Sequence, residues 1–141
     1  MSTTFAPGTE IERGAVWSIV LNRNQNLLGK LMLVLERPCD AVIDLTSDEW
    51  SELHKQVRRV MTALDQLFQP DQYNYSFLMN EDAQVHLHVI PRYELLRSWD
   101  GVTVEDVNYG SLYATHNLEL PVESLERRAN ALRSRLPGVA S

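Results

Sequence analysis

Gln84-Val85-His86-Leu87-His88-Val89-Ile90-Pro91-Arg92 carries most of the information in this sequence. Polar and apolar residues alternate along it, as they do in a β-strand whose two faces differ. We therefore expect Gln84, His86 and His88 to share one face. Two imidazoles and an amide on one wall suit a metal ion held by the histidines, or a phosphate met by a nucleophilic nitrogen and N–H donors. The same pattern fits two half-buried, hydrogen-bonded histidines without a ligand.

The surrounding sequence predicts a sheet and a long helix. Thr46 and Glu49 have capping-box spacing, and apolar residues then recur every three or four positions, which predicts a helix over 47–68. Short apolar segments indicate strands at 10–12, 15–21, 31–35, 74–79 and 85–90. We expect a turn at Arg13-Gly14 to join the first two strands, and residues 80–83 to join the last two as an antiparallel hairpin.

Beyond Pro91 the pattern is irregular until a last helix, predicted over 121–136 with Pro121 in its first turn. The expected fold class is α+β: an antiparallel sheet of about five strands, a long helix on one face and a C-terminal helical extension. We interpret residues 1–141 as a single domain, with a core at about 10–93 and an extension at about 94–141.

Composition narrows the class of protein. The chain has 141 residues, 19 acidic against 13 basic side chains and a formal charge of −6, which argues against a nucleic-acid polymer as partner. The single Cys39 does not fit a disulfide framework or a zinc knuckle. The N-terminal residues do not resemble a signal peptide, and the apolar run at 31–35 is too short to cross a membrane. We expect a cytoplasmic protein that does not contact membranes.

The stretch quoted above resembles the signature of the histidine triad (HIT) family, in which three histidines alternate with apolar residues and run into an ending like Val89–Arg92. The resemblance covers about Val16–Arg92 and is greatest to the fragile-histidine-triad, dinucleoside polyphosphate hydrolase-like branch. Upstream it rests on Asn22-Arg23, Gly29, Arg37-Pro38 and Asp44-Leu45. It implies a HIT-like fold and a homodimer whose sheet extends across the interface.

The resemblance also implies roles for individual residues. His86 falls on the central histidine, which in the family attacks the α-phosphorus of a nucleotide and carries the nucleotidyl group covalently. His88 and Gln84 are expected to bind phosphate, and Asn22 to bind the ribose hydroxyls. Apolar residues at the end of the first long strand and along 31–35 would form the base pocket. A neutral imidazole needs no metal for this attack, provided that a hydrogen bond, which we expect from a main-chain carbonyl, fixes its tautomer.

Three departures from the family pattern bear on function. The first triad position is Gln84 rather than histidine. Lys30 replaces a family histidine and is either a cation near the phosphates or a solvated residue at a strand start; we favour the second. The loop before Gln84 is short and consists of Asn80, Glu81, Asp82 and Ala83; its two carboxylates would repel a polyphosphate unless the substrate carried a divalent cation such as Mg²⁺. We expect no other cofactor.

These observations lead to one main hypothesis and two alternatives. The main one is a nucleotide hydrolase or nucleotidyl transferase that acts on the α-phosphate of a small nucleoside phosphate conjugate, such as a dinucleoside polyphosphate or a phosphoramidate. The first alternative is a nucleotide-binding protein of the same fold with little turnover, which Gln84 and the short loop favour. The second is a small metal-binding domain that uses His86 and His88.

Overall fold

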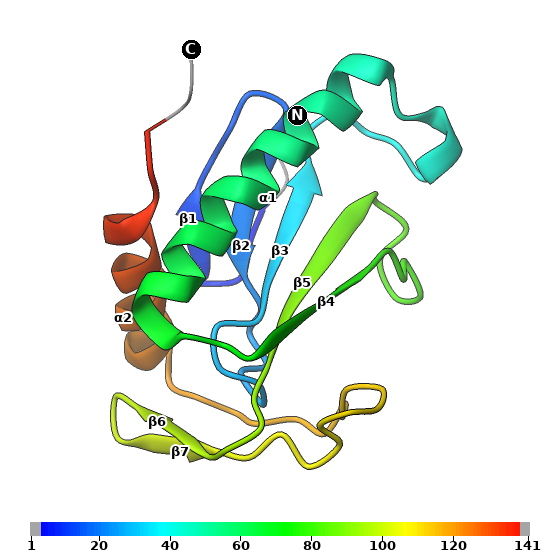
Figure 1. Cartoon of the computed structure of the whole chain (residues 1–141). Helices are drawn as coiled ribbons and strands as arrows, with labels where there is room; N and C mark the ends of the chain where they lie inside the picture. Colours follow the sequence, from blue (N-terminus) through cyan, green and yellow to red (C-terminus); the bar gives the residue numbers. More distant parts are fainter. Residues whose placement is uncertain (1–3, 139–141) are drawn as a thin grey trace.

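The computed structural model describes residues 4–138 as a five-stranded antiparallel sheet with a long helix across one face (Figure 1). The sheet order is β1-β2-β3-β5-β4. Its strands are β1 (Glu10–Glu12), β2 (Trp17–Leu21), β3 (Leu31–Leu35), β4 (Gln72–Ser76) and β5 (His86–Arg92). The helices are η1 (Val42–Asp44, a 3₁₀ turn), α1 (Ser47–Phe68) and α2 (Val122–Arg135), and β6 (Arg97–Trp99) pairs with β7 (Val102–Val104). The α+β class predicted from the sequence is confirmed.

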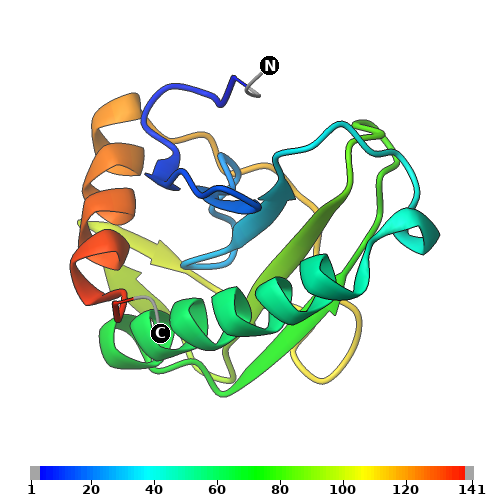
Figure 2. The same cartoon turned by 90° about the horizontal axis from the view of Figure 1, so that it is seen from above.

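Helix α1 begins and ends where the sequence predicts. The Thr46 hydroxyl accepts a hydrogen bond from the Glu49 N–H (3.1 Å), and the Glu49 carboxylate accepts one from the Thr46 N–H (2.9 Å), which completes the capping box. At the other end Gln69 adopts a left-handed conformation (φ 52°) and stops the helix. Seen from above, α1 lies along one side of the sheet, and α2 lies at its β1 end (Figure 2).

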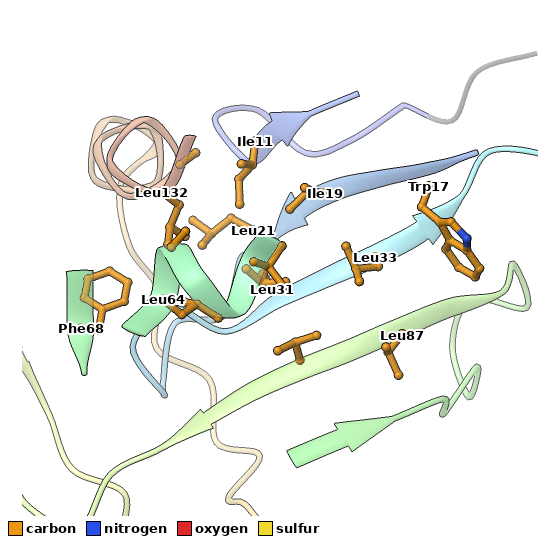
Figure 3. Close-up of a cluster of buried hydrophobic side chains, with 14 of the residues drawn as sticks. Ile11, Trp17, Ile19, Leu21, Leu31, Leu33, Leu64, Phe68, Leu87 and Leu132 are labelled. Carbon is orange, nitrogen blue, oxygen red and sulfur yellow. The ribbon is translucent and has the colours of Figure 1, made fainter. Parts of the chain in front are cut away.

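The hydrophobic core lies between the sheet and these two helices. Alternate strand residues, among them Leu31, Leu33 and Leu87, point into it together with Leu64 of α1 and Leu132 of α2 (Figure 3). The remaining strand residues point to the opposite face. Cross-strand pairing places Met32 opposite His88 and Val34 opposite His86, so both histidines lie on the face away from α1.

A glycine allows β3 to begin close to α1. Gly29 has φ +84°, and a Cβ at this position would lie 2.8 Å from side-chain atoms of Leu64 and Phe68. Any larger residue would therefore strain the backbone and push the strand away from the helix.

The two strands at the other side of the sheet differ from the prediction. β4 covers residues 72–76 instead of 74–79, so the connection to β5 runs over 77–85 instead of 80–83. The pairing ends where Ser76 lies opposite His88, and Met79 then turns the chain with a positive φ of 43°. β5 continues through Pro91, which is tolerated because the pairing with β3 ends at Val89 and only β4 lies beside it there.

The C-terminal residues are packed on the core rather than appended to it. Leu125, Ala129 and Leu132 of α2 are buried in the same cluster as the sheet. The Arg92 guanidinium is buried and donates to both carboxylate oxygens of Asp106 (2.6 and 2.9 Å). The β6–β7 hairpin was not anticipated, because its strands are only three residues long, too short for a pattern to stand out. Within residues 4–138, no helix is long and apolar enough to cross a membrane.

Candidate functional site

A cavity of about 490 Å³ lies on the face of the sheet that carries the histidines. One wall, which we call the sheet wall, consists of side chains from three adjacent strands: Val20, Met32, Val34, His86 and His88. A second wall, the loop wall, consists of residues 78–82 between β4 and β5. The remaining lining comes from residues 4–6, Thr9 and residues 21–23, which include Asn22 and Arg23. The cavity therefore combines an apolar floor with two imidazoles, the Arg23 guanidinium and several amide and carboxylate groups.

His86 is held in one tautomer by the main chain. Its Nδ1 lies 2.6 Å from the carbonyl oxygen of Gln84, and the residue is only 8% exposed. A carbonyl oxygen can only accept a hydrogen bond, so Nδ1 carries a proton, and in the neutral ring the lone pair is then on Nε2. This is the main-chain hydrogen bond expected for a nucleophilic imidazole.

His88 lies beside His86, with its ring edge-on at a centroid distance of 4.7 Å. Burial, and then the neighbouring His86 and Lys30, lower the pKa of His88 to about 4. The ring is therefore neutral near pH 7 and offers one N–H donor and one acceptor to a ligand, without a positive charge.

Asn22 follows the last residue of β2 and lines the cavity. Its side-chain oxygen accepts a hydrogen bond from the Asn24 N–H (2.9 Å), an Asx turn that orients the side chain. The structure thus brings His86, His88 and Asn22 to one cavity. The roles predicted for them remain predictions.

Gln84 does not line this cavity. Its amide nitrogen donates to the main-chain carbonyls of Leu35 (2.6 Å) and Arg37 (2.8 Å), and its amide oxygen accepts from the Cys39 N–H (3.1 Å). Both amide hydrogens are engaged, so binding a phosphate would require breaking these bonds. The Gln84 amide therefore has no free N–H to offer a phosphate.

Lys30 does not line the cavity either, and it is not the solvated residue that we favoured. It is 7% exposed, and its ammonium group donates to the Asn26 side-chain oxygen (2.7 Å). Burial lowers the pKa of Lys30 to about 8. The sequence suggested solvation because lysine at a strand start usually reaches water, but Asn26 offers a buried acceptor four residues earlier.

The N-terminal segment is a part of the site that sequence reasoning missed. Phe5 lines the cavity, and the Arg13 guanidinium lies 4.3 Å from its ring centroid. Thr9 holds the segment in place, because its hydroxyl donates to the Ala6 carbonyl (2.7 Å) and its own carbonyl accepts from the Leu21 N–H (2.7 Å). Residues 4–6 carry no periodic pattern, so no signal in the sequence pointed to them.

Metal ligands do not gather around the histidines. Within residues 4–138, no group of three or more His, Cys, Asp or Glu side chains is placed to hold one metal ion. The remaining histidines, His54 and His116, are exposed and do not line the cavity. A metal site would thus have to rest on His86 and His88 alone.

Comparisons with known proteins find relatives of this sequence. The HIT domain family profile matches residues 17–95, more than half of the chain. A bis(5'-nucleosyl)-tetraphosphatase (asymmetrical) from Schizosaccharomyces pombe is 26% identical, over 94% of this chain and 78% of that protein.

Solved structures share the fold. A histidine triad protein from Bradyrhizobium japonicum superposes with a TM-score of 0.69 at 24% identity, covering 90% of this chain and 89% of the other. Diadenosine triphosphate hydrolase from Plasmodium falciparum superposes with a TM-score of 0.64 at 16% identity, covering 92% of this chain and 77% of the other. With the paired histidines on β5, the HIT domain match over most of the sheet shows that this chain belongs to the HIT family.

Proposed function

We propose that this protein is a nucleotide hydrolase or nucleotidyl transferase in which His86 attacks the α-phosphorus of a nucleoside phosphate conjugate. The observation that carries the proposal is the hydrogen bond from Nδ1 of His86 to the Gln84 carbonyl, which leaves Nε2 as a lone-pair donor at the cavity. Membership of the HIT family and the similarity to a tetraphosphatase support this class of reaction.

The reaction proceeds by two displacements at phosphorus. The Nε2 lone pair forms a bond to the α-phosphorus, and the bond to the leaving group breaks, so that the leaving group departs with the electron pair and takes up a proton. Water then attacks the phosphorus and loses a proton to solvent, the P–N bond breaks and Nε2 regains its lone pair. An alcohol in place of water gives transfer. In the intermediate the ring is cationic, and the Gln84 carbonyl that accepts from Nδ1–H stabilises this charge.

The other lining residues fit the remaining parts of such a substrate. The neutral His88 would donate its N–H to a phosphate oxygen, and Asn22 would bind the ribose hydroxyls. Val20 and Val34, next to Met32 on the sheet wall, offer an apolar surface for the base. Glu81 and Asp82 would oppose a polyphosphate leaving group, so such a substrate would bind with Mg²⁺ on its phosphates.

Intact mass spectrometry tests this function. The protein is incubated with dinucleoside polyphosphates or adenylated amines, quenched and weighed. We expect a nucleotidyl adduct in the wild type and none in His86→Ala, with nucleotide release in the wild type only. Nucleotide binding with neither adduct nor release would contradict the proposal and leave a binding protein. Zinc that survives dialysis and is lost in His88→Ala would instead indicate the metal-binding alternative.

We also propose that the chain forms a homodimer through β4. The two edges of the sheet differ: Arg133 of α2 donates to the main-chain carbonyls of Ile11 (2.6 Å) and Glu10 (2.5 Å) on β1, whereas within residues 4–138 β4 pairs with β5 alone. Tyr75 on β4 is 47% exposed, and Trp50, whose ring centroid lies 6.1 Å from that of Phe77 directly after β4, is 43% exposed. An open edge beside apolar side chains favours pairing with a second copy.

Light scattering after size exclusion tests the dimer. We expect the wild type to have twice the single-chain mass of 16.2 kDa. Trp50→Lys would place a charge in the interface, so we expect its mass to shift toward that of a single chain. A wild-type protein that stays at the single-chain mass at micromolar concentration would contradict the dimer.

A further inference from the structure

We propose that Gln84 is a positioning residue for His86 rather than a ligand of the substrate. Its side chain fixes the segment before β5, so that its own main-chain carbonyl meets Nδ1 of His86. This inference rests on the proposed function, because a fixed tautomer matters only where Nε2 reacts. It assigns to the first triad position a role that needs no contact with phosphate.

Gln84 is held by the connection that leaves β3. Its amide joins three main-chain groups, the carbonyls of Leu35 and Arg37 and the N–H of Cys39, at 2.6, 2.8 and 3.1 Å. The main chain adds two more bonds beside it, from the Val85 N–H to the Cys39 carbonyl (2.8 Å) and from the Leu35 N–H to the Val85 carbonyl (3.1 Å). Five hydrogen bonds thus fix residues 84 and 85 against 35–39.

The residues on the other side of Gln84 have little support of this kind. Glu81, Asp82 and Ala83 are exposed, and Met79 has a positive φ. Gln84 is the first residue after this loop that is anchored to the sheet, and its carbonyl is the group that His86 needs. Without the hydrogen bonds of the Gln84 side chain, the first anchored residue after the loop would be Val85. The main-chain carbonyl of Gln84 could then turn away from Nδ1 of His86.

A glutamine suits this position because of its donor count. The amide supplies two N–H groups to two carbonyls and one oxygen to an N–H. A neutral imidazole has one donor and one acceptor, so histidine could not satisfy all three main-chain groups. Methionine, which has a similar shape, could satisfy none of them.

The anchor extends to the start of α1. The Arg37 guanidinium donates to both carboxylate oxygens of Glu49 (2.8 Å each) and to the Asp44 carbonyl (3.1 Å). Glu49 is also the capping-box residue of α1. The Arg37 carbonyl that Gln84 binds therefore belongs to a residue whose side chain is itself tied to the helix.

The test is Gln84→Met with two measurements. Nitrogen-15 NMR of the imidazoles reports the tautomer of His86 without any substrate. We expect the Nδ1–H form in the wild type and a mixture of both tautomers in the variant. In turnover, we expect kcat to fall about 10- to 100-fold with KM changed less than about twofold, since a misplaced reactive group costs rate more than binding.

Two further variants keep the test decisive. Gln56→Met is the matched control, because Gln56 is a buried, hydrogen-bonded amide on α1 that does not line the cavity, and we expect wild-type tautomer and kcat. Gln84→Glu places a carboxylate against two carbonyls. Its activity relative to the wild type should rise as pH falls, because the protonated carboxyl regains one donor.

Two outcomes would overturn the inference. One is Gln84→Met with the wild-type tautomer and unchanged kcat. The other is a raised KM at constant kcat, which would indicate a direct contact with the substrate. Because the NMR measurement needs no turnover, a wild-type protein that forms no adduct would remove the proposed function and leave the positioning of His86 separately measurable.

Discussion

The sheet wall and the loop wall of the cavity are built in different ways. Side chains of the sheet wall are placed by cross-strand pairing, with Val34 opposite His86 and Met32 opposite His88. The loop wall, residues 78–82, lies outside any strand and is mostly exposed. The reacting nitrogen therefore lies on the part of the cavity with fixed geometry, and the charges that would meet a leaving group lie on the part that sequence change alters most easily.

Removing the proposed nucleophile from the sheet wall should have the largest effect on turnover. For His86→Ala we expect kcat/KM to fall by at least about 10⁴-fold, more than about 5 kcal/mol in transition-state stabilisation, because the proposed P–N bond forms at Nε2 of His86. Steady-state hydrolysis of a dinucleoside polyphosphate measures this. His54→Ala, on the exposed face of α1, is the control. A loss below tenfold would show that His86 is not the nucleophile.

Breaking the support of the sheet wall should cost stability. Arg92→Met removes the partner of Asp106, whose carboxylate is fully buried, and leaves an uncompensated charge. We expect a loss of about 3–5 kcal/mol in the free energy of unfolding, measured in urea. Combining it with Asp106→Leu should restore part of the loss. Equal stability of the single variant and the wild type would refute the importance of this ion pair.

Acid should destabilise the sheet wall through His88. Its pKa is lowered to about 4 in the folded protein, against about 6.5 when unfolded, so the unfolded chain binds the extra proton between these values. Stability should therefore decrease as pH falls from about 6.5 to 4, by about 1–2 kcal/mol after allowance for partial solvent exposure. Urea unfolding of the wild type and His88→Asn measures the difference, and parallel pH profiles would contradict it.

Changing the loop wall should have the smallest effect and should depend on the substrate. Neutralising it with Glu81→Gln and Asp82→Asn should lower KM for a dinucleoside polyphosphate about two- to fivefold without Mg²⁺, and hardly change it with Mg²⁺ or for a phosphoramidate. Glu105→Gln with Glu119→Gln, two exposed residues that do not line the cavity, controls for net charge. If both double variants lowered KM equally, the cause would be the net charge of the protein and not the loop wall.

Local patterns predicted most of the fold. The capping box fixed the start of α1, and continuous apolar runs located β2 and β3, because these signals act over a few residues. The β4 boundary was misplaced because Phe77, Leu78 and Met79 are apolar, yet they leave the sheet where pairing stops. The buried ion pair of Arg92 could not be predicted, since its partner Asp106 is distant in sequence and has no pattern of its own.

The site was predictable only in part, for a related reason. Alternation places His86 and His88 on one face, because a strand imposes a period of two. The same rule assigned Gln84 to that face, but β5 begins at His86, so the period does not extend to it. The environment of Lys30 depends on Asn26 in a folded loop, and the contribution of Phe5 depends on tertiary contacts of the N-terminal segment.

The Arg92 network also bears on the order of events during synthesis. Besides Asp106, the guanidinium donates to the carbonyls of Asn108 (3.0 Å) and Ser111 (2.7 Å), and α2 covers part of the same core. A nascent chain that has emerged only as far as residue 93 contains all five strands of the main sheet. The Arg92 guanidinium then lacks its partner Asp106, and the core lacks α2. We therefore expect the sheet to become stable on the ribosome only after the last third of the chain has been made.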